Sequence, residues 1–134
     1  MIKKIDHIGI AVSSIESREK IYTDGFGIDV LKKVIVPEQG AKIAIMNVGE
    51  VKVELVEPLT ESSPIAGFLK KKGEGIHHIC FEVKDIDAEA QRLKKAGLTL
   101  IEGASPVGAG GSRVLFIHPS STGGVLFELI EHTE

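Results

Sequence analysis

The chain has 134 residues, 43% of them hydrophobic, and its mixed charges sum to a formal net charge of −3. This balance argues against a disordered chain and against a nucleic-acid-binding protein, which would carry a basic patch. No apolar run approaches the roughly 20 residues that span a bilayer, and the single cysteine, Cys80, excludes a disulfide framework. We therefore expect a single-domain cytoplasmic protein without nucleic-acid or membrane partners.

The first half of the chain is typical of a strand, a helix and three further strands. An apolar strand over 5–12 is followed by Ser13 and, three residues later, by Glu16, a pattern that begins helices. We expect this helix to run from about 14 to 24 and to end at the glycines that follow. The next strands are predicted over 28–36, 41–48 and 51–58, with turns at 37–40 and 47–50.

A short helix and a second strand–helix–strand series complete the chain. Ser63 as the N-cap and Pro64 at the first helical position predict a helix that ends near Gly73. The earlier pattern then restarts with a strand over 76–83 and a helix over 86–96, capped by Asp85. The last strands are predicted over 98–102, 112–119 and 125–132, with a glycine-rich stretch at 107–111.

The second half of the chain repeats the first. A shift of 71 residues places His7 on His78, and a shift of 74 places Glu54 in "VKVELVEP" on Glu128 in "VLFELIEH". Such self-similarity indicates a duplicated structural unit. We therefore predict an α+β fold of two tandem βαβββ modules that form a curved, mixed eight-stranded sheet. Module one covers 1–60, a linker helix covers 61–73 and module two covers 74–134.

Each module contributes one histidine and one glutamate to the same side of the predicted sheet. Because side chains alternate between the two faces of a strand, all four lie opposite the residues that pack against the helices. A carboxylate within an apolar strand is costly unless it is paired or binds a metal. Two imidazoles and two carboxylates suit a divalent ion of borderline hardness, and the lack of a cysteine ligand argues against structural zinc. The predicted metal ligands are His7, Glu54, His78 and Glu128.

The three other histidines are interpreted as structural. Alternation directs His77 to the face opposite His78, so the doubled histidine is not a pair of ligands. His118 is interpreted as a turn or pocket-rim residue, and His132 as a solvated residue near the end of the chain.

Five stretches of the chain carry a family resemblance: "DHIGIAV", "PEQG", "VELVEPL", "SSPIAGFLKKKGEGIHHICFEV" and "GAGGSRVLFIHPSSTGGVLFELIE". In them the chain resembles the methylmalonyl-CoA epimerase family of the vicinal oxygen chelate (glyoxalase/bleomycin resistance) superfamily. The resemblance implies an enzyme that interconverts (2R)- and (2S)-methylmalonyl-CoA through a metal-stabilised enolate. It also implies the same four metal ligands, one divalent ion per chain and a homodimer. Co²⁺ is the expected ion, with Mn²⁺, Ni²⁺ or Zn²⁺ as substitutes.

Epimerisation at C2 needs an acid/base group on each face of the planar enolate. We assign these roles to Glu128 and to Glu38 in the "PEQG" turn, because Ile43 occupies the position at which some relatives have a glutamate base. The acyl-CoA substrate is expected to bind backbone amides and a guanidinium of the glycine-rich stretch. The residues assigned to substrate binding are Gly110, Gly111, Ser112 and Arg113.

Two alternative functions are left open by the residues. Glyoxalase I (lactoylglutathione lyase) can use the same His-Glu-His-Glu set, but it usually carries an arginine where this chain has Ala11. A non-catalytic small-molecule-binding protein of the same fold would need no metal ligands, so the intact set disfavours it.

Overall fold

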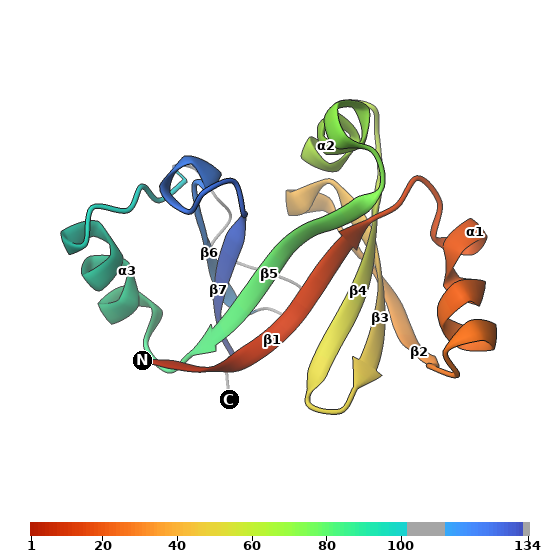
Figure 1. Ribbon diagram of the computed structural model, residues 1–134, viewed down its shortest axis with the longest axis horizontal. Coiled ribbons are helices and arrows are strands. Elements are labelled where there is room, and N and C mark those ends of the chain that lie inside the picture. Colours follow the sequence, from red (N-terminus) through yellow and green to blue (C-terminus); the bar gives the residue numbers. More distant parts are fainter. Residues whose placement is uncertain (102–111, 133–134) are drawn as a thin grey trace. The chain divides into compact units, whose positions relative to one another are not determined.

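The computed structural model describes residues 1–101 and 112–132, which divide into two compact units. The N-unit comprises His7–His77, and the C-unit comprises Met1–Asp6 together with His78–Glu134. Strands β1 (Ile2–Ala11) and β5 (Gly75–Val83) each contribute residues to both units (Figure 1). Among the described residues, no helix is long and apolar enough to cross a membrane.

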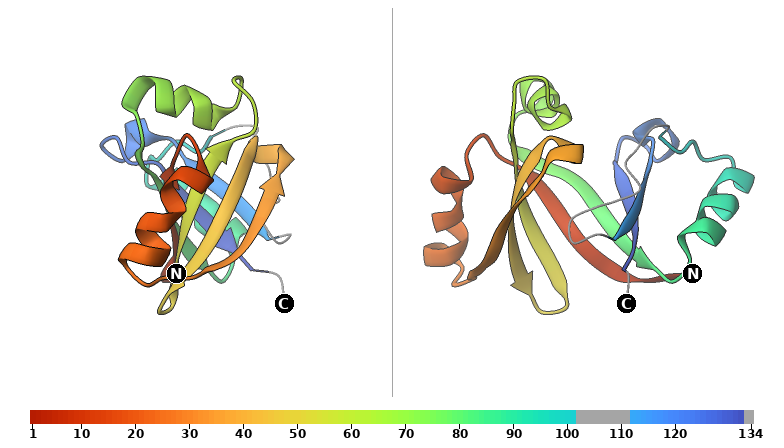
Figure 2. Two further views of the ribbon diagram at one scale, coloured as in Figure 1. Left: turned by 90° about the vertical axis from the view of Figure 1, so that its right-hand side faces the viewer. Right: turned by 180° about the vertical axis from the view of Figure 1, so that it is seen from behind.

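The N-unit orders its strands β2-β3-β4-β1. Strand β3 is antiparallel to both β2 and β4, whereas β1 runs parallel to β4. Helix α1 packs against β4, and helix α2 packs against the same strand (Figure 2). The elements that follow β1 are α1 (Ile15–Lys20), a π-helical turn (Ile21–Gly25), β2 (Val30–Val36), a 3-10 turn (Pro37–Gln39), β3 (Ala41–Val48), β4 (Val51–Pro58) and α2 (Pro64–Lys72).

The C-unit repeats this arrangement, with strand order β5-β7-β6. Its first strand is again parallel to its last, since β5 pairs parallel with β7, and β6 is antiparallel to β7. Helix α3 packs on β6 and β7. The elements that follow β5 are α3 (Ile86–Lys95), β6 (Arg113–Ile117), a 3-10 turn (Pro119–Ser121) and β7 (Phe127–Glu131).

The predicted α+β class with mixed strand pairing is confirmed, but the described residues form seven strands instead of eight. The eighth was expected over 98–102. There Leu100 makes only an isolated antiparallel bridge with Ile117, at the outer side of edge strand β6. The Ile101 amide donates to the Phe116 carbonyl and the His118 amide to the Thr99 carbonyl, but residues 98–101 form no strand of their own, and residue 102 lies outside the described residues.

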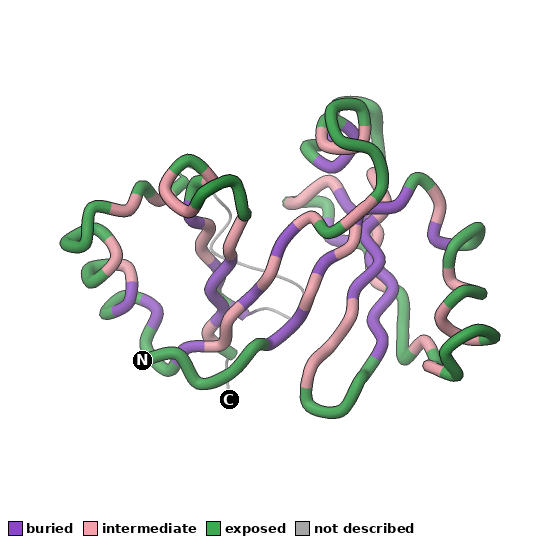
Figure 3. Tube along the Cα trace, viewed as in Figure 1, coloured by how far each residue is buried: buried purple, intermediate pink, exposed green. Residues whose placement is uncertain are grey.

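Equivalent residues build the two hydrophobic cores beneath the helices (Figure 3). Each core combines buried side chains of the strands with the first residue of the helix that covers them. In the N-unit they are Val12, Ile15, Ala44, Met46 and Leu55, and in the C-unit Val83, Ile86, Ile117 and Leu129. The same repeat shifts of 71 and 74 residues relate Val12 to Val83 and Leu55 to Leu129. The duplication read from the sequence therefore extends to the packing of each unit.

Two of the three helices begin at the predicted N-cap residue, and the third begins one residue later than predicted. Asp85 and Ser63 cap α3 and α2 as expected. Helix α1 is capped by Ser14, whose hydroxyl accepts from the Ser17 amide, and not by Ser13. Serine side chains at either position offer the same acceptor, so the local pattern did not distinguish them.

A glutamate from the end of each unit's last strand supports the first helix of that unit. The Glu57 carboxylate accepts a hydrogen bond from the Ile15 amide at 2.7 Å, and Glu131 accepts one from the Ile86 amide at 2.9 Å. Each carboxylate satisfies an amide that has no partner within its helix and adds negative charge at the positive end of the helix dipole.

Replacing Glu131 with alanine should lower the free energy of unfolding by about 1–2 kcal/mol, because it removes this charge-assisted cap. Glu57→Ala should have an effect of similar size on the N-unit. The measurement is urea denaturation followed by circular dichroism. The exposed Glu61 provides the control, since its replacement should change stability by less than about 0.5 kcal/mol. Equal stabilities of the Glu131 and Glu61 variants would contradict the assigned cap.

Candidate functional site

The N-unit brings His7 and Glu54 together inside the protein. His7 lies on β1 and Glu54 on the parallel neighbour β4, where Gly9 is the strand partner of the glutamate. The His7 Nε2 atom is 3.6 Å from Glu54 Oε1, and the two residues are only 5% and 6% exposed. Gly9 has no side chain, so the space beside the imidazole on this face of β1 stays open to the glutamate.

The C-unit repeats this pair with His78 and Glu128. The Nε2 atom of His78, on β5, is 3.2 Å from Glu128 Oε1 on the parallel strand β7. Both residues are buried, at 8% and 3% exposure. The strand partner of Glu128 is Cys80, two residues after the histidine, which is the offset that Gly9 has in the N-unit. The His78 imidazole and the Phe116 ring also form a T-shaped pair, with the centroids 6.4 Å apart.

Each buried pair offers one imidazole nitrogen and one carboxylate oxygen. Burying an ionised carboxylate is costly, and a neighbouring imidazole or a bound cation compensates for that cost. Nitrogen and oxygen donors of this kind suit divalent ions such as Zn²⁺, Ni²⁺, Co²⁺ and Mn²⁺. The donor chemistry of both pairs therefore fits the metal ligands predicted from the sequence.

Glu38, the second predicted acid/base residue, lies in the exposed 3-10 turn between β2 and β3. The turn ends at Gly40, whose φ of +62° is in the left-handed region that favours glycine. A Cβ at Gly40 would also come within 3.1 Å of the Ser63 hydroxyl at the start of α2. The close approach of this turn to α2 thus requires a glycine. Ile43 is buried in β3, with 3% exposure.

The predicted substrate-binding residues fall at the start of β6. Gly110 and Gly111 lie outside the described residues. Ser112 is buried, and its hydroxyl is 3.1 Å from His132 Nδ1. Arg113 makes a two-pronged contact with Asp87 of α3, at 3.0 and 2.9 Å. These hydrogen bonds and the opposite charges lower the pKa of the Asp87 carboxyl and raise the pKa of the Arg113 guanidinium.

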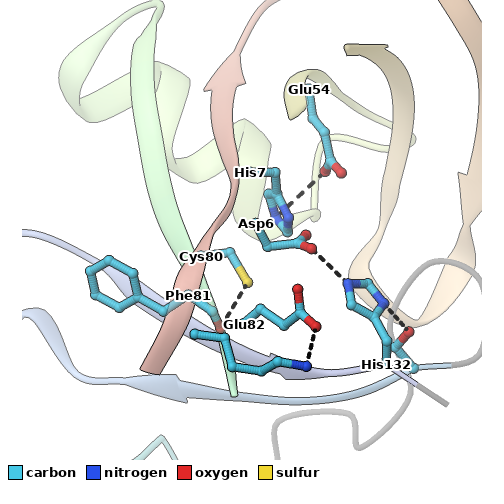
Figure 4. A network of polar contacts seen from close by, with 9 residues as sticks. Asp6, His7, Glu54, Cys80, Phe81, Glu82 and His132 are labelled. Carbon is cyan, nitrogen blue, oxygen red and sulfur yellow. Dashed lines mark hydrogen bonds and ion pairs between the residues drawn. The ribbon is translucent and has the colours of Figure 1, made fainter. Parts of the chain in front are cut away.

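The three remaining histidines are His77, His118 and His132, and the surroundings of His132 differ from those predicted. His77 packs edge-on against Phe68, with ring centroids 4.9 Å apart. His118 is a turn residue, as expected, and its Nδ1 accepts a hydrogen bond from the Ser120 amide. His132 is not simply solvated: its Nε2 is 2.6 Å from the carboxylate of Asp6, which is buried (Figure 4). No spacing in the sequence links two residues so far apart along the chain.

Comparisons with known proteins agree with this architecture. The sequence profile of the Glyoxalase/Bleomycin resistance protein/Dioxygenase superfamily matches residues 6–116. The mitochondrial methylmalonyl-CoA epimerase of Homo sapiens is 42% identical over 127 residues, which cover 94% of this chain and 72% of the human protein. The ethylmalonyl-CoA/methylmalonyl-CoA epimerase of Cereibacter sphaeroides is 42% identical over 131 residues, covering 96% of this chain and 98% of that protein.

A solved structure extends the similarity to three dimensions. A variant of Streptomyces coelicolor methylmalonyl-CoA epimerase, in complex with 2-nitronate-propionyl-CoA, superposes with a TM-score of 0.94 at 33% identity and covers 100% of both chains. Identity of 42% over most of the length of both relatives, together with the same fold, establishes the family. The chain belongs to the glyoxalase/bleomycin resistance protein/dioxygenase superfamily and, within it, to the methylmalonyl-CoA epimerase family.

Proposed function

We propose that this protein interconverts (2R)- and (2S)-methylmalonyl-CoA by proton transfer at C2. The observation that carries the proposal is the 42% identity to named epimerases over nearly all of this chain, combined with two equivalent buried His/Glu pairs. Hydrophobic packing alone would not place a carboxylate and an imidazole at the same position of both units. The pairs are therefore best explained as parts of the reaction machinery.

The proposal assigns one divalent ion per chain to the four ligands His7, Glu54, His78 and Glu128. It rests on their donor chemistry, on the duplication and on the family resemblance. When bound, the ion supplies Lewis-acid stabilisation of the negative charge that develops on substrate oxygens. Co²⁺ as the working ion, a homodimeric assembly and a cytoplasmic location belong to the same proposal.

The chain's own carboxylates are proposed to move the C2 proton. A carboxylate has two oxygens, so Glu128 can keep one beside His78 and use the other as a base. Glu38 lies on an exposed turn and is proposed to serve the opposite face of the planar intermediate. One residue removes the proton and the other returns it, which inverts the configuration.

Binding of the CoA portion is assigned to Gly110, Gly111, Ser112 and Arg113. Because the Ser112 hydroxyl contacts His132, its backbone amide is the donor that we propose for the substrate. Arg113 would have to exchange part of its contact with Asp87 for an anionic group of CoA. The exposed position of this ion pair makes the exchange inexpensive.

The assay that tests the function offers two substrates to the Co²⁺-reconstituted protein. We expect turnover of (2R)- or (2S)-methylmalonyl-CoA and none of the hemithioacetal of glutathione, the substrate of glyoxalase I. Turnover of the hemithioacetal without turnover of methylmalonyl-CoA would replace the epimerase proposal with the glyoxalase alternative. Binding without turnover of either would favour a non-catalytic role.

A further inference from the structure

A second group of metal-ligating side chains lies within the C-unit and includes none of the four predicted metal ligands. It consists of Asp6 on β1, Glu82 near the end of β5 and His132 just after β7 (Figure 4). One ligand atom from each residue lies within 4.8 Å of the other two. Three segments that are distant in sequence thus bring two carboxylates and an imidazole to one place.

The imidazole of His132 is held from both sides. Its Nδ1 atom is 3.1 Å from the Ser112 hydroxyl, and its Nε2 atom is 2.6 Å from Asp6 Oδ1. A metal-binding histidine commonly has its second ring nitrogen fixed by such a hydrogen bond, which orients the ring and selects the tautomer. The 2.6 Å contact requires a proton between Nε2 and the Asp6 carboxylate. A bound metal would replace this proton, leaving Nδ1–H to donate to the buried Ser112 hydroxyl and Nε2 to serve as the ligand atom.

The charges of the group favour a cation. Lys3 Nζ is 3.3 Å from Glu82 Oε2 and balances one of the two carboxylates. The Asp6 side chain is 4% exposed, whereas those of Glu82 and His132 are 15% and 40% exposed. The group therefore has a buried anionic side and a side open to solvent, through which an ion and its water ligands can enter.

We propose that Asp6, Glu82 and His132 form a second divalent metal site, which takes Zn²⁺ with water as the fourth ligand. Zinc accepts nitrogen and oxygen ligands at about 2.0–2.2 Å, so tetrahedral ligand atoms stand about 3.4 Å apart. Binding therefore requires the distance between His132 Nε2 and Asp6 Oδ1 to increase from 2.6 Å. It also requires the Glu82 carboxylate to turn from Lys3 toward the ion. None of its three ligands is a residue assigned to the epimerase function, although Ser112, which contacts His132, is one of the proposed substrate-binding residues.

Calorimetric titration of the metal-free full-length protein with Zn²⁺ tests this site. We expect His132→Ala to lose one bound zinc relative to the unchanged protein. The matched control is His118→Ala, which removes an exposed histidine from a turn and should lose none. The comparison counts only zinc that depends on His132, so it does not depend on whether the four proposed epimerase ligands bind their ion.

A second variant, in which zinc affinity should increase, keeps the test decisive even if the His132 variant misfolds. Lys3→Gln removes the competing cation and should tighten the second zinc site about five- to tenfold. A destabilised protein would not bind more tightly. The site is disproved if His132→Ala binds as much zinc as the His118 variant, or if Lys3→Gln leaves every zinc affinity unchanged.

Discussion

Replacing His78 with alanine should lower kcat/KM for methylmalonyl-CoA by about 10³-fold or more, while the same change at the adjacent His77 leaves it close to the original value. A metal that stabilises developing charge contributes several kcal/mol, and each 1.36 kcal/mol corresponds to a tenfold change in rate. His78 is buried beside Glu128, whereas His77 packs against Phe68. The measurements are epimerisation kinetics and bound metal per chain.

The His77 variant is a demanding control because it removes the same side chain one residue away. Its expected cost is in stability, about 0.5–1.5 kcal/mol from the lost edge-to-face contact with Phe68. If His77→Ala lost metal and activity to the same extent as His78→Ala, the assignment of His78 as a ligand would be wrong. Full activity of the His78 variant at saturating metal would have the same consequence.

Glu128→Gln should reduce epimerisation by about 10²–10⁴-fold, the usual contribution of a general acid/base group. The amide keeps a carbonyl oxygen as a ligand but does not accept the C2 proton. Deuterium incorporation at C2, followed in D₂O for each epimer separately, is the informative measurement. The variant should lose exchange from one epimer and keep exchange from the other, with Glu38→Gln showing the reverse preference.

Glu131→Gln is the matched control for this experiment, since it changes the same residue type in the same strand. Glu131 supports the start of α3, so its replacement should affect stability and leave proton exchange unchanged. The role of Glu128 as a base fails if Glu128→Gln retains its metal and still exchanges and epimerises at the original rate.

The local patterns predicted most of the secondary structure. Ser63 and Asp85 cap helices as expected because a capping hydrogen bond spans only two or three residues of sequence. The start of α1 was one residue off, because Ser13 and Ser14 offer the same acceptor. The expected eighth strand would have to pair with the outer edge of β6, where Leu100 forms only one bridge, with Ile117. Partners of this kind are not encoded in the segment itself.

The sequence by itself determined which side chains form the two buried His/Glu pairs. Strand alternation is a local property, and duplication places the same residue types at equivalent positions, so His7, Glu54, His78 and Glu128 could be selected without coordinates. Tertiary structure decided the registers that bring each histidine to its glutamate, at 3.6 and 3.2 Å. It alone joined His132 to Asp6, 126 residues away. Such contacts arise from long-range strand pairing and the burial of whole units, which no short stretch of sequence records.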